Sequence, residues 1–185
     1  MSDMKLLKVY YDHLKMFENG IFQIDLFAAD KVPAADESAY PLGKSLYSNN
    51  LMAFAGINAS GKSTALNLID LACRILDGAP LASAGLPTQL PGAFDGNIAF
   101  KCAFYHEKGI YLVESQIAPN GNAHVRELGG FGLRFMDEAL SLIPASSFKK
   151  AMLGDWETLR AASKPLMQRS DMPDSWRALV SGDES

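Results

Sequence analysis

Residues 56–63 read GINASGKS, and this spacing of Gly, Lys and Ser is the one that phosphate-binding P-loops require. Gly56 and Gly61 allow the backbone to turn where a side chain would collide with a phosphate group. Lys62 can reach the β- and γ-phosphate oxygens of a nucleotide, and the hydroxyl of Ser63 can ligate Mg²⁺. The chemistry predicted for this segment is therefore the binding of ATP with Mg²⁺.

Neighbouring residues add to the predicted contacts. Asn58, Ala59 and Ser60 lie within the loop, whose successive backbone N–H groups would form an anion-binding nest. A helix that starts near Gly61 would direct the positive end of its dipole at the same phosphates. Thr64 adds a contact at the α-phosphate. We expect all of these residues to belong to the nucleotide site.

Two flanking elements must position this loop. Residues 51–55 form the apolar run LMAFA, which is typical of a strand buried on both faces. Residues 64–77 place apolar side chains at helical spacing, and Gly78 is a helix stop signal. A glycine-rich turn that binds nothing would explain neither Lys62 and Ser63 nor these flanking elements.

The rest of the chain is predicted to open with strands and close with helices. The apolar residues 6–10 and the alternating residues 22–26 flank an Asn-Gly turn, which indicates an antiparallel pair. Residues 98–105 and 110–113 indicate a second hairpin. Further along, we expect surface loops at 28–50 and 79–93, a short strand at 123–128, and helices at 135–143 and 148–159.

Composition limits the class of protein. The 185 residues, 48% of them hydrophobic and 21% charged, suit one ordinary globular domain with at most a small appendage. The net charge of −4 gives no indication of nucleic acid or an anionic membrane as a partner. No signal peptide and no apolar run of roughly 20 residues is present, which predicts a cytoplasmic location. His106 and His124 have no neighbours at metal-ligand spacing and receive no role.

Further features of the sequence indicate which nucleotide and which protein family to expect. The Asn-Lys-x-Asp and Asp-x-x-Gly motifs of GTPases are absent, which favours ATP. The order of elements in this chain resembles the start of the ABC/SMC-like ATPases. It consists of a strand, residues 14–17, a second strand and then residues 54–64. The chain is most similar to the amino-terminal part of bacterial and phage AAA-family ATPases of the overcoming-lysogenization-defect and RecF-like kind. Their loops often carry Asn where Asn58 stands, and the resemblance covers roughly residues 5–117.

The resemblance implies an α/β fold, a P-loop NTPase lobe with an antiparallel β-subdomain at its N-terminus. Residues 1–128 would form this ATP-binding lobe, and residues 129–185 a helical segment and polar tail. Family members clamp ATP between two heads, so the expected partner is a second copy or a separate subunit or lobe. That partner would supply the signature Ser-Gly-Gly segment. A DNA-related or phage-defence function is common in the family, although no basic stripe indicates DNA binding.

Hydrolysis in this family needs a Walker B strand that ends in Asp-Glu. The best match is residues 133–139, which contain Asp137 and Glu138 but are interrupted by Arg134. The apolar residues of 135–143 also follow a helical stripe, so a surface helix with Asp137 and Glu138 facing outward is the favoured alternative.

The positions of two further residues make them candidates for the nucleotide and Mg²⁺ site. In the family, a glutamine at the end of a core strand contacts Mg²⁺ and the attacking water, and Gln116 follows the second predicted hairpin. Lys15 lies in the turn between the first two strands, where relatives approach the nucleotide. The alternative for each is an ordinary polar surface residue.

Three functions remain open. The first is an ATP-binding lobe of a longer or split ATPase, which hydrolyses ATP only with groups supplied in trans or by missing sequence. The second is a small P-loop kinase that phosphorylates a metabolite, with a lid drawn from Arg160, Arg169 and Arg177, which are not clustered in the sequence. The third is a regulatory module that binds nucleotide without hydrolysing it.

Overall fold

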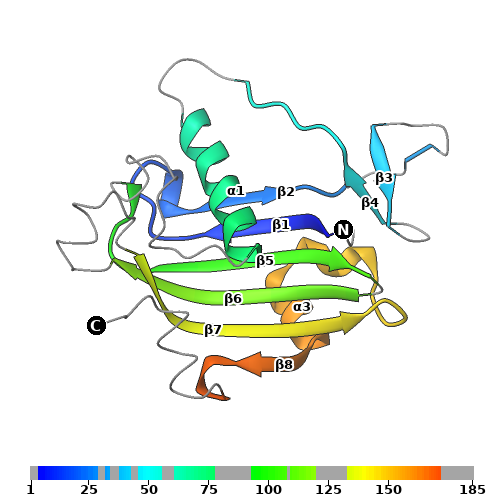
Figure 1. Cartoon of the computed structure of the whole chain (residues 1–185). Helices are drawn as coiled ribbons and strands as arrows, with labels where there is room; N and C mark the ends of the chain where they lie inside the picture. The colour runs from blue at the N-terminus through cyan, green and yellow to red at the C-terminus, as the bar shows by residue number, and fades with distance from the viewer. Residues whose placement is uncertain are drawn as a thin grey trace.

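The computed structural model of the chain is built on one sheet of six strands, in the order β2-β1-β5-β6-β7-β8 (Figure 1). Every neighbouring pair in this sheet is antiparallel. The structure describes residues 4–28, 32–33, 38–42, 46–55, 61–77, 93–107, 109–119 and 133–171. The strands of the sheet are β1 (Lys5–Tyr11), β2 (Phe22–Asp25), β5 (Ile98–His106), β6 (Gly109–Pro119), β7 (Leu133–Pro144) and β8 (Lys164–Gln168).

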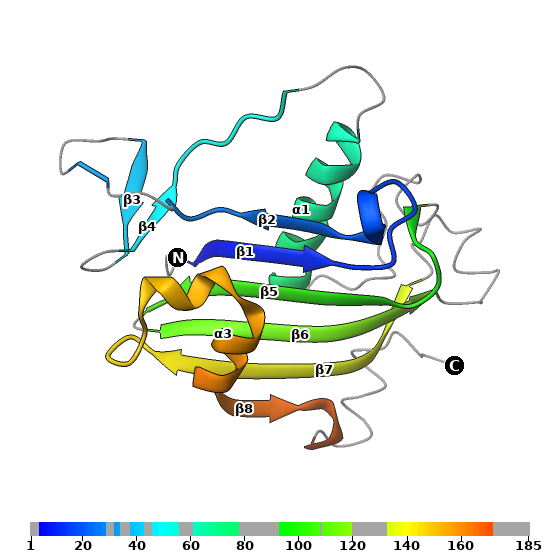
Figure 2. The ribbon, with the colours of Figure 1, turned by 180° about the vertical axis from the view of Figure 1, so that it is seen from behind.

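Helices cover the two faces of the sheet. The helix α1 (Lys62–Leu76) crosses one face, and α3 (Trp156–Ala162) packs on the other (Figures 1 and 2). No helix among the described residues combines the length and the apolar character that crossing a membrane requires. The remaining elements are a two-stranded sheet of β3 (Ala39–Pro41) and β4 (Tyr47–Asn49), and the 3-10 turns η1 (Glu18–Gly20), η3 (Lys150–Gly154) and η4 (Arg169–Asp171).

The alternation of side chains along the strands gives the sheet two cores. Cys102 and Ala103 follow each other on β5 and are both fully buried, yet Cys102 belongs to the core under α1 and Ala103 to the core under α3. On α1, the buried side chains recur every three or four residues and form one apolar stripe. This stripe consists of Ala65, Leu68, Leu71 and Ala72.

Several predictions from the sequence are confirmed. The first antiparallel pair is β1 with β2, and the second hairpin is β5 with β6. The predicted helix at 64–77 is α1, and part of the predicted helix at 148–159 lies in η3 and α3. The strand expected at 123–128 and most of the loop expected at 79–93 lie outside the described residues.

The predicted α/β P-loop NTPase fold is wrong. The six-stranded sheet is antiparallel throughout and contains no parallel strand pair, so the protein is mainly β. Residues 51–55, the strand expected before the phosphate-binding loop, form no strand, and Leu51 is 83% exposed. An apolar run of this length cannot form a stable strand without a partner to complete its hydrogen bonds. The ABC/SMC-like resemblance, which required the P-loop unit, is therefore overturned. The predicted loop at 28–50 also contains β3 and β4.

The predicted helical segment at 135–143 is also wrong, because these residues lie in β7. The strand pairs with β6 along the full length of β6, from Gly109 opposite Pro144 to Pro119 opposite Leu133. Such extended pairing outweighs a local helical pattern. A bulge opposite Gln116 and Ile117 then shifts the alternation of β7 by one residue. The sheet thereby joins residues from both predicted segments, 1–128 and 129–185.

Candidate phosphate-binding site

The helix α1 begins directly after Gly61, which caps its N-terminus. Gly61 adopts the left-handed conformation, with φ of 82° and ψ of 5°. A residue with a Cβ would be strained there, whereas glycine is not. Gly61 therefore lets the chain turn sharply into the helix. Gly56, Asn58, Ala59 and Ser60 lie outside the described residues.

The first turn of α1 presents backbone donors. The first hydrogen bond within the helix runs from the N–H of Ala65 to the carbonyl of Gly61, at 2.8 Å. The N–H groups of Lys62, Ser63 and Thr64 come before it and have no acceptor within the helix. Gly61 supplies no capping side chain, and the first turn contains no acidic residue. The positive end of the helix dipole is therefore not neutralised by the helix itself, which suits an anion.

The turn between β1 and β2 lies against this first turn. The hydroxyl of Thr64 contacts the sulfur of Met16 at 3.7 Å, and a Cβ placed on Gly61 would be 4.0 Å from the ring of Phe17. Lys15 belongs to the same turn, as the sequence suggested. Its ammonium group faces Asp95, with the Nζ and Oδ1 atoms 3.9 Å apart.

The structure brings Gln116 and Asp137 together. They lie opposite each other on β6 and β7, and both side chains are exposed. Glu114, two residues before Gln116 on the same strand, pairs with Arg160 of α3 at 2.6 Å. Because residues two apart on a strand share a face, Gln116 and Asp137 lie on the α3 face, opposite to α1.

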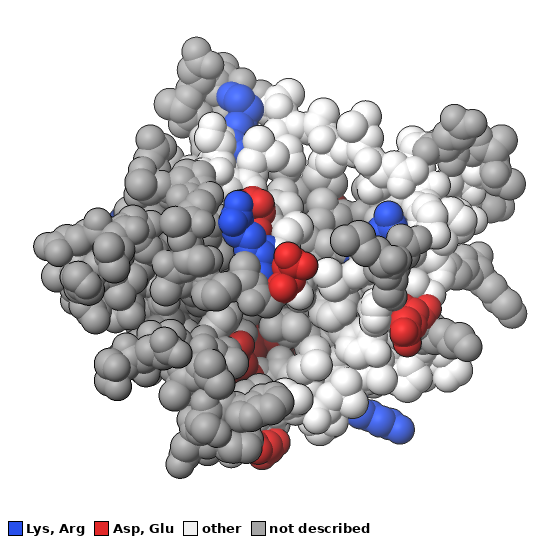
Figure 3. All heavy atoms as spheres, in the orientation of Figure 1, with Lys and Arg blue, Asp and Glu red and all other residues white. Residues whose placement is uncertain are grey.

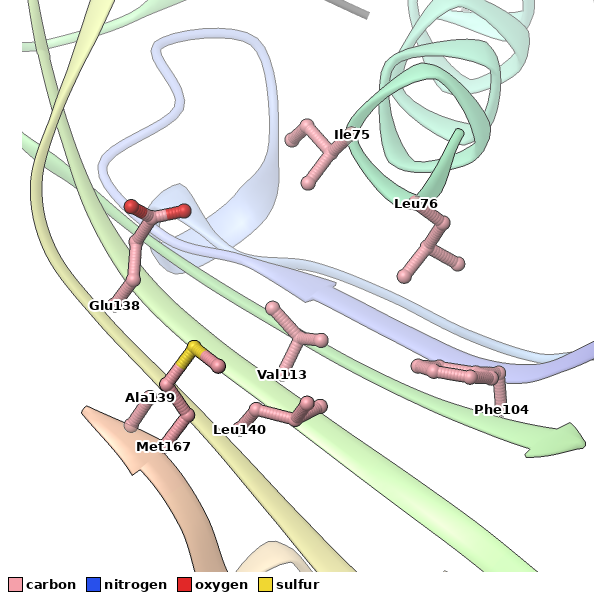
Figure 4. Close-up of a pocket in the computed structure, with 8 residues that line it drawn as sticks. All are labelled: Ile75, Leu76, Phe104, Val113, Glu138, Ala139, Leu140 and Met167. Carbon is pink, nitrogen blue, oxygen red and sulfur yellow. The ribbon is translucent and has the colours of Figure 1, made fainter. Parts of the chain in front are cut away.

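Glu138 points to the α1 face instead, near the C-terminal residue Leu76 of that helix (Figure 4). Arg169 donates a hydrogen bond from Nη1 to the Oε2 atom of Glu138 at 2.8 Å. Burial raises the pKa of Glu138, and the charge of Arg169 opposes this rise. Because an α-helix rises about 1.5 Å per residue, Leu76 lies about 20 Å along the axis from Lys62. The structure therefore does not bring Glu138 to the first turn of α1.

Mg²⁺ at this site would depend on the nucleotide. Among the described residues, no group of three or more His, Cys, Asp or Glu side chains could hold a metal ion. Ser63 is exposed and would contribute one hydroxyl ligand. This fits Mg²⁺, which takes most of its ligands from phosphate oxygens and water in nucleotide sites.

The sequence did not indicate the contacts that three residues make in these surroundings. Met16 and Phe17 entered only as part of residues 14–17, which resemble the ATPase family, and Arg169 only as a candidate for a kinase lid. Only the packing of the turn on α1 and the position of η4 after β8 give them their roles. On the face that carries α1, the described Lys and Arg side chains do not gather into one basic patch (Figure 3).

Comparison with known proteins adds no relative from which a role could be transferred. No family model, no curated protein and no solved structure matches this chain.

Proposed function

We propose that this chain binds ATP with Mg²⁺ through the first turn of α1 and the loop that leads into it. The observation that carries the proposal is the left-handed Gly61 at the start of a 15-residue helix, followed at once by Lys62 and Ser63. The phosphates would accept hydrogen bonds from the first-turn N–H groups and pair with Lys62. Ser63 would ligate the Mg²⁺ ion.

This proposal does not depend on the fold that the sequence suggested. Anion binding at a helix N-terminus comes from N–H groups that have no acceptor within the helix and from the helix dipole, which are local properties. The helix must be held rigidly, and α1 buries Leu68 and Leu71 completely against the sheet. The first turn is therefore fixed in direction before a ligand arrives.

Binding, and not hydrolysis, is the activity proposed for the described residues. Asp137 lies on the opposite face of the sheet, and Glu138 lies near the far end of α1 in an ion pair. In this account, any hydrolytic group comes from a partner subunit or from sequence outside the described residues. The kinase alternative gains no support, because Arg160 and Arg169 pair with carboxylates and Arg177 lies outside the described residues.

Calorimetric titration with ATP, with and without Mg²⁺, tests the proposal. Loss of a charge-assisted contact should make Lys62→Ala bind ATP at least about tenfold more weakly than the wild type. Lys149→Ala is the matched control, because Lys149 is exposed and precedes η3 at a distance from α1 in sequence and fold. Equal affinity of the wild type and Lys62→Ala, or no binding by the wild type, would rule the proposal out.

A further inference from the structure

A cavity of about 260 Å³ lies between the C-terminal end of α1 and the strands β5 to β8 (Figure 4). Ile75 and Leu76 approach it from the helix, and Val113 and Leu140 from the sheet. The described residues that line it are apolar with the exception of one, Glu138. Binding pockets for small molecules commonly combine such an apolar wall with a single well-placed polar group.

The two ends of the cavity differ in chemistry. Phe104 lies at one end, and its ring stacks on Tyr111 with a centroid distance of 5.3 Å. At the other end stands the carboxylate of Glu138, and Met167 of β8 lies at this end as well (Figure 4). A ligand would therefore place an aromatic or aliphatic body toward Phe104 and a polar atom toward Glu138.

The polar end is electrically balanced. Arg169 pairs with the Oε2 atom of Glu138 at 2.8 Å, and the two side chains are only 12% and 20% exposed. No described residue donates a hydrogen bond to the Oε1 atom of Glu138. Because Glu138 and Arg169 already neutralise each other, a charged ligand would lose its hydration in this apolar cavity without gaining a counter-charge. A neutral hydrogen-bond donor avoids this penalty and can bond to Oε1.

The size of the cavity limits the body of the ligand. An apolar cavity of about 150 Å³ accepts a benzene ring, so 260 Å³ has room for roughly ten non-hydrogen atoms. This is the size of a fused two-ring aromatic system.

We propose that this cavity binds a small neutral heteroaromatic molecule that carries one N–H donor. The ring system packs between Leu76 and Val113, and the N–H donates to Glu138. The site is separate from the proposed nucleotide site, because it lies at the opposite end of α1. The two proposals therefore stand or fall independently.

Indole and 1-methylindole are matched probes, since they share a ring system and differ in the N–H donor. Titration of the ¹⁵N-labelled protein should give an indole Kd on the order of 0.1–1 mM, as expected for a ligand of this size. The shifted amides should be those of β7 and the end of α1. 1-Methylindole should bind about tenfold more weakly, because it cannot donate to Glu138. Equal affinities for the two probes, or no shifts with indole, would overturn the proposal.

Two variants locate the site without disturbing a core. Met167 and Leu166 are neighbours on the exposed strand β8, and only Met167 lines the cavity. Met167→Trp should fill the cavity and abolish indole binding, while Leu166→Trp should bind indole as the wild type does. Retained binding in Met167→Trp would contradict the proposal. ATP titrations of both variants should be unchanged, which keeps this result distinct from the nucleotide test.

Discussion

The phenol of Tyr11 on β1 donates a hydrogen bond to the main-chain carbonyl of Leu68 in α1, at 3.0 Å. Both residues are completely buried, and the Tyr11 ring packs on Phe100 with a centroid distance of 5.0 Å. Burial raises the pKa of Tyr11 well above its ordinary value, so the phenol remains a donor at neutral and mildly alkaline pH. This bond ties the middle of α1 to the sheet and fixes the direction of the helix.

Tyr11→Phe should destabilise the protein modestly. It removes one buried hydrogen bond and keeps the ring, and the Leu68 carbonyl retains its bond within the helix. The expected loss is about 1 kcal/mol in the free energy of unfolding, measured by urea denaturation. Affinity for ATP should change little, because the first turn of α1 stays intact. A loss above about 3 kcal/mol would show that the phenol does more than this single bond.

Ser115→Ala should leave stability unchanged or raise it slightly. Ser115 on β6 is 5% exposed, and its hydroxyl has no hydrogen-bond partner among the described residues. Burying an unpaired hydroxyl is unfavourable, so its removal relieves a cost of about 1 kcal/mol. Thermal unfolding measures the difference. A clear drop in melting temperature would mean that the hydroxyl has a partner or role that this account lacks.

Asp25→Ala should cost more stability than Lys8→Met. The Nζ atom of Lys8 lies 2.7 Å from the Oδ1 atom of Asp25, and the two side chains are 1% and 43% exposed. Removing Asp25 takes away the ion-pair partner of a buried ammonium group, which keeps only the ring of Trp156 with its centroid 5.6 Å away, at an expected cost of about 3 kcal/mol. Removing Lys8 leaves a carboxylate that water can reach. Denaturant unfolding of both variants decides the order, and the reverse order would refute this reading of the pair.

His13 should make stability depend on pH. A hydrogen bond to the Asp12 carboxylate, together with its charge, raises the pKa of His13 above 6.5. Since the folded pKa is the higher one, the stabilisation is fully present below about pH 6.5 and is lost as the pH rises through the folded value.

His13→Asn is the variant that tests this dependence. His13 has a φ of 53°, and Asn tolerates this left-handed conformation. Melting temperatures of the wild type and the variant should converge as the pH rises from about 6 to 8. A constant difference across that range would exclude His13 as the source.

The sequence predicted elements whose patterns are local. The alternation of residues 22–26 gave β2, and the helical spacing after Gly61 gave α1. The prediction of a helix at 135–143 failed, because this segment is the strand β7. A bulge breaks its alternation and leaves Phe135 and Ile143 in different cores. Only the pairing with β6, a long-range contact, makes that segment a strand.

In the candidate site, too, the residues that depend on local sequence could be predicted and the long-range contacts could not. Gly61, Lys62 and Ser63 could be predicted because a helix start depends on adjacent residues. The strand register sets Gln116 opposite Asp137, although their numbers differ by 21. The ion pair joins Glu138 to Arg169, whose numbers differ by 31. No spacing rule in a single sequence reports such pairings.

The most direct test of the central proposal is an NMR titration of the ¹⁵N-labelled protein with ATP and Mg²⁺. We predict that the amide resonances of Gly61, Lys62, Ser63 and Thr64 shift, because their N–H groups would donate to phosphate oxygens. The amides of η3, on the far face of the sheet, should stay in place. Shifts that leave the first turn of α1 untouched, or no shifts at all, would contradict the proposal.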